Sequence, residues 1–573
     1  MGGRGGYECF PDGNCLFTIA QWFPRMAVYS DAGGWIHKQF LGSGEFTLPF
    51  GKYLVKITVP EDHLVAATGT LKNPEAVLTD KQRELLKKAE TATKPVIITT
   101  QQEAIEKELA YVSYKSGKSK KSLGKKTWIY EADSVRDFAW GSSRKFIWDA
   151  MGVPINGKTV MAMSYYPKEA NPLWEKYSTE VVAHTLKVYS KYTIPYPYPK
   201  AISVEASNGM EYPMICFNYG RPEPDGTYSD RVKYGMISVI IHEVGHNFFP
   251  MVINSDERHW TWMDEGLNSF VQFLAEQEWE RDYPSRRGPA HKIVDYMKGD
   301  KKNDNPIMTD SESVLQLGNN AYGKPATALN ILRETIMGRE LFDYAFKEYC
   351  RRWAFKHPTP ADFFRTMEDA SGTDLDWFWR GWFYTLDHVD IAIEDVILYQ
   401  VDTQDPDIEK LRAKKEREKQ PSYIYVQRND KEIPQRAVDL KPDLKDFYNT
   451  YDPLDVTQTD RDKFAAYYNS LSEEEKKFLK SGKYFYQLTF TNKGGLVMPI
   501  ILEMEFEDGT KELKRIPAEI WRYHNEKVTK VFATVKPVKQ FTLDPYLETA
   551  DVDTENNYFP PKVTTSRFQL YKQ

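Results

Sequence analysis

Two histidines and a glutamate lie inside the apolar stretch VIIHEVGHNFFP, which runs from Val239 to Pro250. An ionisable side chain in an apolar run costs free energy unless it is paired or binds a metal ion. In a helix, residues four apart lie on one face, so His242 and His246 can direct ring nitrogens at one point. Glu243 then lies about 100° further round the helix. This H-E-x-x-H arrangement predicts a zinc site with two histidine ligands and Glu243 as general base.

A catalytic zinc ion needs a third protein ligand and an open position for water. Glu265 completes the pattern H-E-x-x-H-x18-E within the amphipathic stretch RHWTWMDEGLNSFVQFLAEQ, where an unpaired carboxylate would be costly. We therefore predict one zinc ion per chain, bound by His242, His246 and Glu265. Asp264 is expected to orient His246, because metal-bound histidines commonly donate their second N–H to a carboxylate. Alternatively, Asp264 is an acid that stabilises the start of its helix.

The composition limits the classes of protein to which the chain can belong. With 573 residues, of which 41% are hydrophobic and 28% charged, the chain is long enough for several ordinary globular domains. A formal net charge of -6 is close to neutral at this length, which argues against nucleic acid as a partner. No run of 18 apolar residues occurs, so no transmembrane segment is expected. The oligomeric state is not predicted.

The cysteines and the first residues of the chain give information about the cellular compartment of the protein. Four cysteines are too few for a disulfide scaffold, and none forms a C-x-x-C pair. Cys9 and Cys15 could form a bridge, but free thiols are expected. The opening residues MGGRGGYECFPDGNC lack the apolar core of a signal peptide.

Local patterns divide the chain into three parts and predict a multidomain α+β fold. Residues 1–141 are expected to form a partial N-terminal β domain, since residues 44–68 alternate between apolar and polar positions. Residues 73–126 are polar and lysine-rich, which indicates an insertion that carries a flexible basic loop. Residues 142–387 are expected to be mainly helical, with apolar residues spaced three and four apart.

The remaining residues, 388–573, return to a strand pattern. Their first part, 405–423, is dense in charge and is expected to be a linker or an exposed insertion. After it, alternating apolar residues and turn signals such as Asp508-Gly509 predict a β-sandwich-like domain.

Three motifs in order resemble one peptidase family. The H-E-x-x-H-x18-E spacing resembles the gluzincin zinc metallopeptidases, and within them the membrane alanyl aminopeptidase family. NGMEYP, residues 208–213, resembles the family's G-x-M-E-N exopeptidase motif, and NAYGKPATALNIL resembles its Tyr-x-Lys-Gly segment. The resemblance implies a thermolysin-like catalytic domain, Glu211 as the residue that holds the substrate's free amine, and Tyr322 as the residue that stabilises the oxyanion. Gln21 stands in a stretch that resembles the family's amine-side glutamine.

The chain also departs from the family pattern. Tyr212 and Asp264 each stand where the family usually has asparagine, and Pro325 stands where it has glycine. Only 17 residues precede TIAQWFPRMAVYSD, whereas the family's N-terminal domain normally has many strands there. We therefore expect an N-terminally truncated chain with an incomplete first domain. Because a signal peptide could have been lost with those strands, an exported or periplasmic location is favoured over the cytoplasm, although the sequence does not establish it.

The predicted function is a zinc-dependent aminopeptidase that acts on peptides with a free N-terminus. Glu211 would meet the substrate's ammonium group, while the backbone at Gly209 and Met210 would pair with the substrate as an added strand. A zinc hydrolase with epoxide or endopeptidase activity could use the same scaffold. An inactive binding relative is the other alternative, and the complete ligand-and-base set argues against it.

Overall fold

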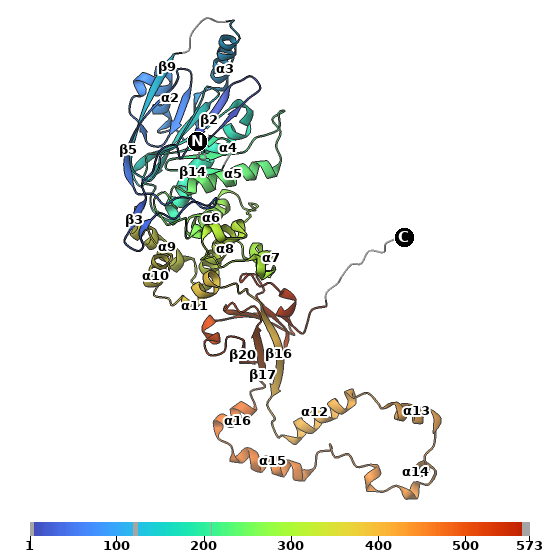
Figure 1. Cartoon of the computed structure of the whole chain (residues 1–573). Coiled ribbons are helices and arrows are strands. Elements are labelled where there is room, and N and C mark those ends of the chain that lie inside the picture. Colours follow the sequence, from blue (N-terminus) through green and yellow to red (C-terminus); the bar gives the residue numbers. More distant parts are fainter. Residues whose placement is uncertain (1–4, 119–123, 208, 564–573) are drawn as a thin grey trace.

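The computed structural model describes residues 5–118, 124–207 and 209–563, and the structural statements below concern these residues. Figure 1 shows an elongated chain with a β-rich part at the N-terminal end, a helical middle and a second β-rich part. A group of helices lies beyond the second β-rich part. The predicted multidomain α+β class, with a β-sheet region, a helical zone and a C-terminal β region in this order, is confirmed.

Three small sheets make up the N-terminal part. One has four strands in the order β1-β2-β10-β6, one has three in the order β5-β9-β7, and β3 pairs with β4. Along β5, exposed residues alternate with more buried ones, which is the period-two pattern that the sequence predicts. The strands are β1 (Gly6–Cys9), β2 (Cys15–Ile19), β3 (Val28–Ser30), β4 (Gly34–Ile36), β5 (Gly51–Pro60), β6 (Leu64–Ala67), β7 (Thr70–Leu71), β9 (Lys125–Val135) and β10 (Trp140–Ser143).

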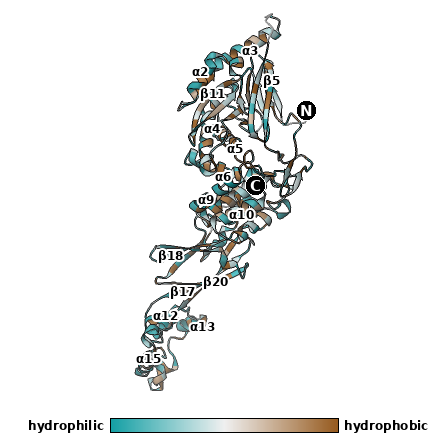
Figure 2. Cartoon of the chain, turned by 90° about the vertical axis from the view of Figure 1, so that its left-hand side faces the viewer, coloured by the Kyte–Doolittle hydropathy of each residue, from teal (hydrophilic) through white to brown (hydrophobic). Residues whose placement is uncertain are grey.

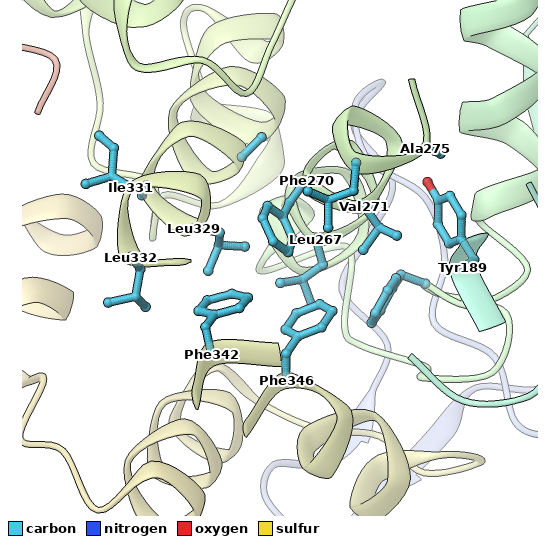
Figure 3. Packing of buried hydrophobic residues seen from close by; sticks show 14 of the residues in the cluster. Tyr189, Leu267, Phe270, Val271, Ala275, Leu329, Ile331, Leu332, Phe342 and Phe346 are labelled. Carbon is cyan, nitrogen blue, oxygen red and sulfur yellow. The ribbon is translucent and has the colours of Figure 1, made fainter. Parts of the chain in front are cut away.

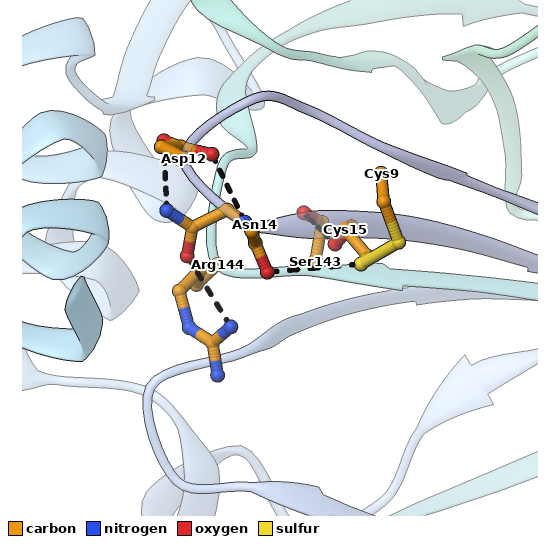
Figure 4. The surroundings of a disulfide bond; sticks show 7 residues. Cys9, Asp12, Asn14, Cys15, Ser143 and Arg144 are labelled. Atoms are coloured by element: carbon orange, nitrogen blue, oxygen red, sulfur yellow. Dashed lines mark hydrogen bonds between the residues drawn. A yellow bond between two sulfur atoms is a disulfide. The ribbon is translucent and has the colours of Figure 1, made fainter. Parts of the chain in front are cut away.

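A disulfide joins Cys9 and Cys15, so the expectation of free thiols at these positions is wrong (Figure 4). The two residues are opposite each other in the antiparallel pair β1-β2, which brings their Cβ atoms close together. The turn between them is held by Asn14, whose backbone N–H donates to Asp12 Oδ1 over 2.9 Å. Sequence spacing alone does not reveal this register. Cys216 and Cys350 are free and buried.

A six-stranded sheet follows, in the order β14-β15-β13-β12-β11-β8. Strands β12, β13 and β15 are parallel, and the other pairs are antiparallel. On β13, Ala201 packs towards the helices, whereas Ile202 and Val204 pack towards the N-terminal sheets. Burial on both faces explains its continuous apolar run. The strands are β8 (Val96–Thr99), β11 (Ile147–Ile155), β12 (Lys158–Tyr166), β13 (Lys200–Glu205), β14 (Met210–Tyr212) and β15 (Ile215–Asn218).

The composition of the lysine-rich segment also favours helices, and the structure has three helices among its described residues. The segment contains α1 (Pro74–Val77), α2 (Asp80–Ala89) and α3 (Gln101–Lys115). A capping box stabilises the N-terminus of α2 and that of α3. Strand β8, between them, joins β11 in the six-stranded sheet. The segment is therefore a folded part of that sheet, while part of the expected basic loop lies outside the described residues. The domain boundary near residue 141 stays a prediction.

Helices cover one face of this sheet and continue into the middle of the chain. Helices α4 and α5 pack on the sheet and on each other, and α6 packs on both. Figure 3 shows how Leu267 and Phe270 of α6 meet Leu329 of α8 and Phe342 and Phe346 of α9. The main helices are α4 (Leu173–Tyr192), α5 (Asp230–Gly245), α6 (Thr261–Trp279), α7 (Val294–Lys298), α8 (Lys324–Ile331), α9 (Arg339–Trp353), α10 (Pro360–Ser371) and α11 (Asp376–Trp379).

Two antiparallel sheets form the C-terminal β region, in the orders β16-β17-β20 and β19-β18-β21-β22. Strand β16 precedes the charge-dense segment, so that segment is an insertion within the domain and not a linker ahead of it. The apolar residues at the start of β16 form too short a run for their period to distinguish a strand from a helix. The strands are β16 (Ile391–Gln400), β17 (Tyr484–Asn492), β18 (Ile500–Phe506), β19 (Lys511–Ile516), β20 (Lys527–Thr534), β21 (Val538–Leu543) and β22 (Tyr558–Phe559).

We name residues 401–483 the helical excursion. It leaves the sheet after Gln400 and returns at Tyr484, and these two residues are paired across β16 and β17. In both views its helices lie away from the rest of the chain (Figures 1 and 2). They are α12 (Pro406–Lys419), α13 (Ile424–Glu432), α14 (Ala437–Leu440), α15 (Gln458–Ser470) and α16 (Glu473–Leu479).

Among the described residues, none of the helices combines the length and the apolar character needed to cross a membrane.

Candidate metal centre

Helix α5 carries the H-E-x-x-H residues. Ser229 caps its start, and apolar residues of its last turns pack into the core. His246 follows the last helical residue but keeps a helical φ of -57° and ψ of -18°, so the four-residue spacing is preserved. At Gly245 an added Cβ would lie 2.3 Å from both the Tyr189 hydroxyl and Asn268 Oδ1. Only glycine lets α4 and α6 approach this turn so closely.

Helix α6 brings Glu265 to the two histidines. Nε2 of His242 lies 3.0 Å from Nε2 of His246 and 3.0 Å from Oε2 of Glu265. Nε2 of His246 lies 3.4 Å from the same carboxylate oxygen. The three atoms that the sequence predicts as ligands therefore converge on one point.

The other ring nitrogen of His242 is held by Gln272. The Gln272 amide donates from Nε2 to Glu276 over 2.9 Å, which leaves its Oε1 as an acceptor 2.9 Å from His242 Nδ1. Asn268 Nδ2 lies 3.2 Å from the same Nδ1, but it donates over 2.9 Å to the His242 carbonyl oxygen. His242 Nδ1 thus carries the proton, and burial lowers the pKa of the ring. The Nε2 lone pair is free to bind a metal ion.

His246 is oriented in the same way by two acceptors. Its Nδ1 lies 2.8 Å from the carbonyl oxygen of Phe249 and 2.8 Å from Oδ1 of Asp264. The N–H is directed at the Phe249 carbonyl, since Asp264 Oδ1 has no partner with hydrogen-bond geometry. Asp264 therefore acts on the ring mainly through its charge. Nδ1 is the protonated nitrogen, and Nε2 faces Glu265.

The three ligand atoms fit a zinc ion in type and separation. Two imidazole nitrogens and one carboxylate oxygen form a common protein ligand set of catalytic zinc. Ligand atoms of a tetrahedral zinc with bonds of about 2.0–2.1 Å lie roughly 3.3–3.4 Å apart, close to the 3.0, 3.0 and 3.4 Å found here. A second group, Glu211, His246 and Asp264, offers ligand atoms within 4.8 Å of one another. It is the poorer candidate, because His246 Nδ1 is occupied.

Buried charges perturb each other strongly around this point. Burial raises the pKa of Glu243 well above its usual value, and the nearby Glu211 adds to the effect. Burial opposes charge on His246, but the carboxylates of Glu211, Asp264 and Glu265 raise its pKa well above the usual range. Binding of a metal ion therefore requires His246 to release a proton from Nε2. A divalent cation at the ligand set would favour the charged forms of the surrounding carboxyl groups.

The role of Asp264 can be tested through metal affinity. Asp264→Asn removes the charge that faces His246 Nδ1, and changes at such positions typically cost about 10- to 100-fold in metal affinity. We expect the zinc Kd to rise by about tenfold or more, measured by competition with a chelator. Asp282→Asn, at an exposed acid just beyond α6, is the matched control. Equal affinity in the two variants would favour a role only at the start of the helix.

Glu243 lies beside the ligand set and not within it. Its Oε1 lies 3.1 Å from where a Cβ of Gly209 would stand, so the backbone of the G-x-M-E-N-like segment passes directly over this carboxylate. Its Oε2 is buried and has no hydrogen-bond partner among the described residues. A buried carboxylate with one free oxygen is suited to accept a proton.

Strand β14 places Glu211 and Tyr212 on opposite faces of the sheet edge. Glu211 is buried, and one of its carboxylate oxygens belongs to the group with His246 and Asp264. Tyr212 packs into the core of the N-terminal part, with its ring 6.0 Å from that of Phe217. The departure from the family's asparagine is thus accommodated in that core. Met210 is buried in the same cluster, and Asn208 lies outside the described residues.

Tyr322 reaches the site from a π-helical turn, residues Gly318–Gly323, ahead of α8. Its hydroxyl donates to Oε1 of Glu265 over 2.6 Å, and its ring stacks on His242 with centroids 5.8 Å apart. Burial raises the pKa of Tyr322 well above its usual value, so the hydroxyl keeps its proton. It is therefore a hydrogen-bond donor at the edge of the ligand set.

Gln21 is the predicted residue with the weakest connection to the site. Its side-chain amide donates to Glu45 over 3.4 Å. The negative charge of Glu45 contributes to the raised pKa of Glu243, so Glu45 lies near the site. A role for Gln21 in binding the amine stays a prediction.

Sequence reasoning missed Arg287. Its guanidinium lies 4.3 Å above the ring of Tyr322. It comes from the segment between α6 and α7, which matches no motif used above. The dipeptide Arg286-Arg287 followed by Gly288 is the only local signal, and charged pairs are common on protein surfaces.

The site and its surroundings define a class of protein. A His–His–Glu set on two packed helices, with a glutamate beside it and a glutamate on the neighbouring strand, is the arrangement of a gluzincin-type zinc metallopeptidase. A family model described as "Peptidase family M1 domain" matches residues 177–382. Over these residues the chain is similar to that family, in agreement with the resemblance to the alanyl aminopeptidase family.

Curated relatives match about a third of the chain. "Probable aminopeptidase 1" of Sulfurisphaera tokodaii is 26% identical over 221 residues, covering 36% of this chain and 28% of the relative. "Aminopeptidase M1-A" of Oryza sativa is 24% identical over 224 residues, covering 36% of this chain and 25% of the relative. The alignments thus span only about a quarter of the length of these relatives.

One solved structure extends the likeness to nearly the whole chain. It is the crystal structure of Legionella pneumophila aminopeptidase A in complex with aspartic acid. The TM-score is 0.53 at 12% identity, and the match covers 95% of this chain and 48% of the other. At this identity, the similarity concerns the fold.

Proposed function

We propose that this chain is a zinc-dependent aminopeptidase that removes N-terminal residues from peptides. The observation that carries the proposal is the convergence of His242, His246 and Glu265 on one point. We further propose one zinc ion per chain at this point. When bound there, zinc polarises the scissile carbonyl and lowers the pKa of water.

The side chains around the ligand set supply the proton transfers. Glu243, with its free buried oxygen, takes a proton from the attacking water and passes it to the leaving amine. Tyr322 donates a hydrogen bond to the oxyanion that develops on the scissile carbonyl, which requires its hydroxyl to turn from Glu265 to the substrate. Both residues touch the place where the reacting atoms would lie.

Glu211 makes the proposed enzyme an exopeptidase. Its buried carboxylate, on the middle residue of β14, can receive the substrate's ammonium group, and a charge pair in a dry site is stronger than in water. The backbone of Gly209 and Met210 runs beside Glu243, where it can pair with an extended substrate. Because the Glu211 carboxylate lies at a fixed distance from the ligand set, it favours cleavage next to the N-terminus of the peptide substrate.

A hydrolase of epoxides or an endopeptidase on the same scaffold remains the alternative. Neither explains why an anionic group is buried next to the ligand set. An inactive binding relative is disfavoured because all three ligands and the base are present and face one another. We also propose an exported location, which the Cys9–Cys15 disulfide supports, because disulfides persist in oxidising compartments.

Four rates test the assignment of Glu211. The unmutated enzyme should cleave a peptide with a free amine and cleave its acetylated form poorly, because acetylation removes the charge that Glu211 binds. Glu211→Gln should lower the rate of cleavage of the free peptide by about tenfold or more, as expected for loss of a charge-assisted contact. The difference between the cleavage rates of the free and the acetylated peptide should therefore become smaller. The zinc content should not change.

Equal cleavage of the free and acetylated peptides by the unmutated enzyme would contradict the aminopeptidase assignment. Cleavage in the middle of long peptides would replace it with an endopeptidase.

A further inference from the structure

A cavity of about 290 Å³ opens beside the ligand set, between α5, α6 and the segment that precedes α7. His242, Glu243 and Tyr322 form its wall on the side of the ligand set. Arg286 and Arg287 also line the cavity. The cavity is therefore continuous with the place of reaction, and it contains two positive charges that the reaction does not use.

Arg287 has no anionic partner among the described residues. Its guanidinium packs on the Tyr322 ring and forms no ion pair or hydrogen bond there. Glu276, a buried acid that lines the same cavity, is already satisfied by three neutral donors. These are Ser238 Oγ at 2.8 Å, Gln272 Nε2 at 2.9 Å and Ser285 Oγ at 2.5 Å. A half-buried guanidinium without an anion is costly, so the cavity is suited to a ligand that supplies one.

The segment that carries Arg287 is held firmly. Ser285 binds Glu276 of α6, and the Tyr283 hydroxyl lies 2.7 Å from Ser238 Oγ of α5. Gly288 has a φ of +104°, and an added Cβ would lie 2.4 Å from Phe273. Glycine at this position lets the backbone pass close to α6. The guanidinium is thus fixed before a ligand arrives, which lowers the entropy cost of binding.

The position of the cavity indicates which part of a peptide enters it. Glu211, which would hold the amine, lies with His246 and Asp264, and none of these three residues lines the cavity. The cavity instead begins at His242, one helical turn earlier on α5, and at Glu243. Glu243 is the group that would protonate the leaving amine. A peptide anchored at Glu211 would therefore extend its leaving part towards the cavity.

We propose that the cavity receives the residue after the scissile bond and that Arg287 binds a carboxylate there. The proposal rests on the aminopeptidase function proposed above and deepens it. The preferred substrates are then peptides with a carboxylate just after the bond that is cut. This group is either an acidic side chain on the second residue or the C-terminal carboxylate of a dipeptide. The planar guanidinium can donate two parallel hydrogen bonds to either one.

The test measures binding to a zinc-loaded Glu243→Gln chain, which should bind peptides without cleaving them. Calorimetry compares Ala-Asn amide, Ala-Asp amide and Ala-Asn with a free C-terminus. At least one of the two peptides that carry a carboxylate should bind about tenfold more tightly than Ala-Asn amide, the gain expected for a charge-assisted pair. The peptide that gains identifies the source of the carboxylate.

With Arg287→Gln added to this chain, the Kd values of the peptides with and without the carboxylate should differ by no more than about twofold. The matched control is Arg281→Gln, which removes an exposed positive charge from the same segment outside the cavity and should keep the preference. A purely structural role of Arg287 would change all three Kd values together and leave their ratios unchanged. Equal binding of the three peptides while Arg287 is present would overturn the proposal.

Turnover by the unmutated enzyme separates the two proposals. Hydrolysis of alanine p-nitroanilide needs no carboxylate, so its absence from a zinc-loaded enzyme would contradict the aminopeptidase function itself. Hydrolysis together with equal binding of the three peptides would contradict only the role of Arg287.

Discussion

His246→Ala should reduce the zinc content from one ion per chain to nearly none and abolish peptide hydrolysis. His246 is 1% exposed and supplies one of three converging ligand atoms, and alanine offers no atom that can bind the metal ion. The loss of one of three ligands also leaves His242 and Glu265 too few to hold the ion tightly. Elemental analysis of the purified protein and the rate on alanine p-nitroanilide measure the two effects.

His291→Ala is the control, because His291 is exposed and lies outside the site. It should keep both zinc and activity. Retention of one tightly bound zinc by His246→Ala, or its absence from the unmutated protein after reconstitution, would contradict the proposed metal centre.

Glu243→Gln should keep zinc and lower kcat by about 10²- to 10⁴-fold, the usual contribution of a positioned general base. The change removes the proton acceptor but preserves the shape of the side chain, and it leaves all three ligands in place. Because the ground state loses little, KM should change much less than kcat. Steady-state kinetics with parallel zinc analysis show whether both hold.

Glu280→Gln, at an exposed residue directly after α6, provides the matched control and should behave as the unmutated enzyme. A Glu243→Gln enzyme with an almost normal kcat would require another base. Loss of zinc in this variant would show that Glu243 supports the ligand set and not only the proton transfer.

The centre of the site could be predicted because its geometry is local. The i, i+4 spacing of His242 and His246 needs only a helix, and Glu265 needs only a second helix packed on the first. The long-range contacts could not be read in this way. No sequence motif marks the Phe249 carbonyl that accepts the His246 N–H. None marks Gln272, which accepts from His242, either.

The fold shows the same division between local and long-range information. Period-two alternation over residues 44–68 predicted strand β5, and capping boxes explain α2 and α3. The pairing of β8 with β11, however, joins residues about fifty positions apart, and polarity along the chain does not encode it. Arg287 was missed for a related reason. Its neighbours come from α5, α6 and the Tyr322 turn, and only the tertiary structure brings them together.

The helical excursion has a consequence for how the chain can change over time. The residues that flank it, Gln400 and Tyr484, are paired across β16 and β17. The excursion is therefore a loop whose two ends are closed by the sheet. The entropy cost of closing a loop grows only logarithmically, by about 0.6 kcal/mol for each doubling of length. Insertions and deletions in this loop therefore carry almost no thermodynamic penalty for the sheet. Selection can reshape the excursion while the metal centre, built on α5 and α6, is left untouched.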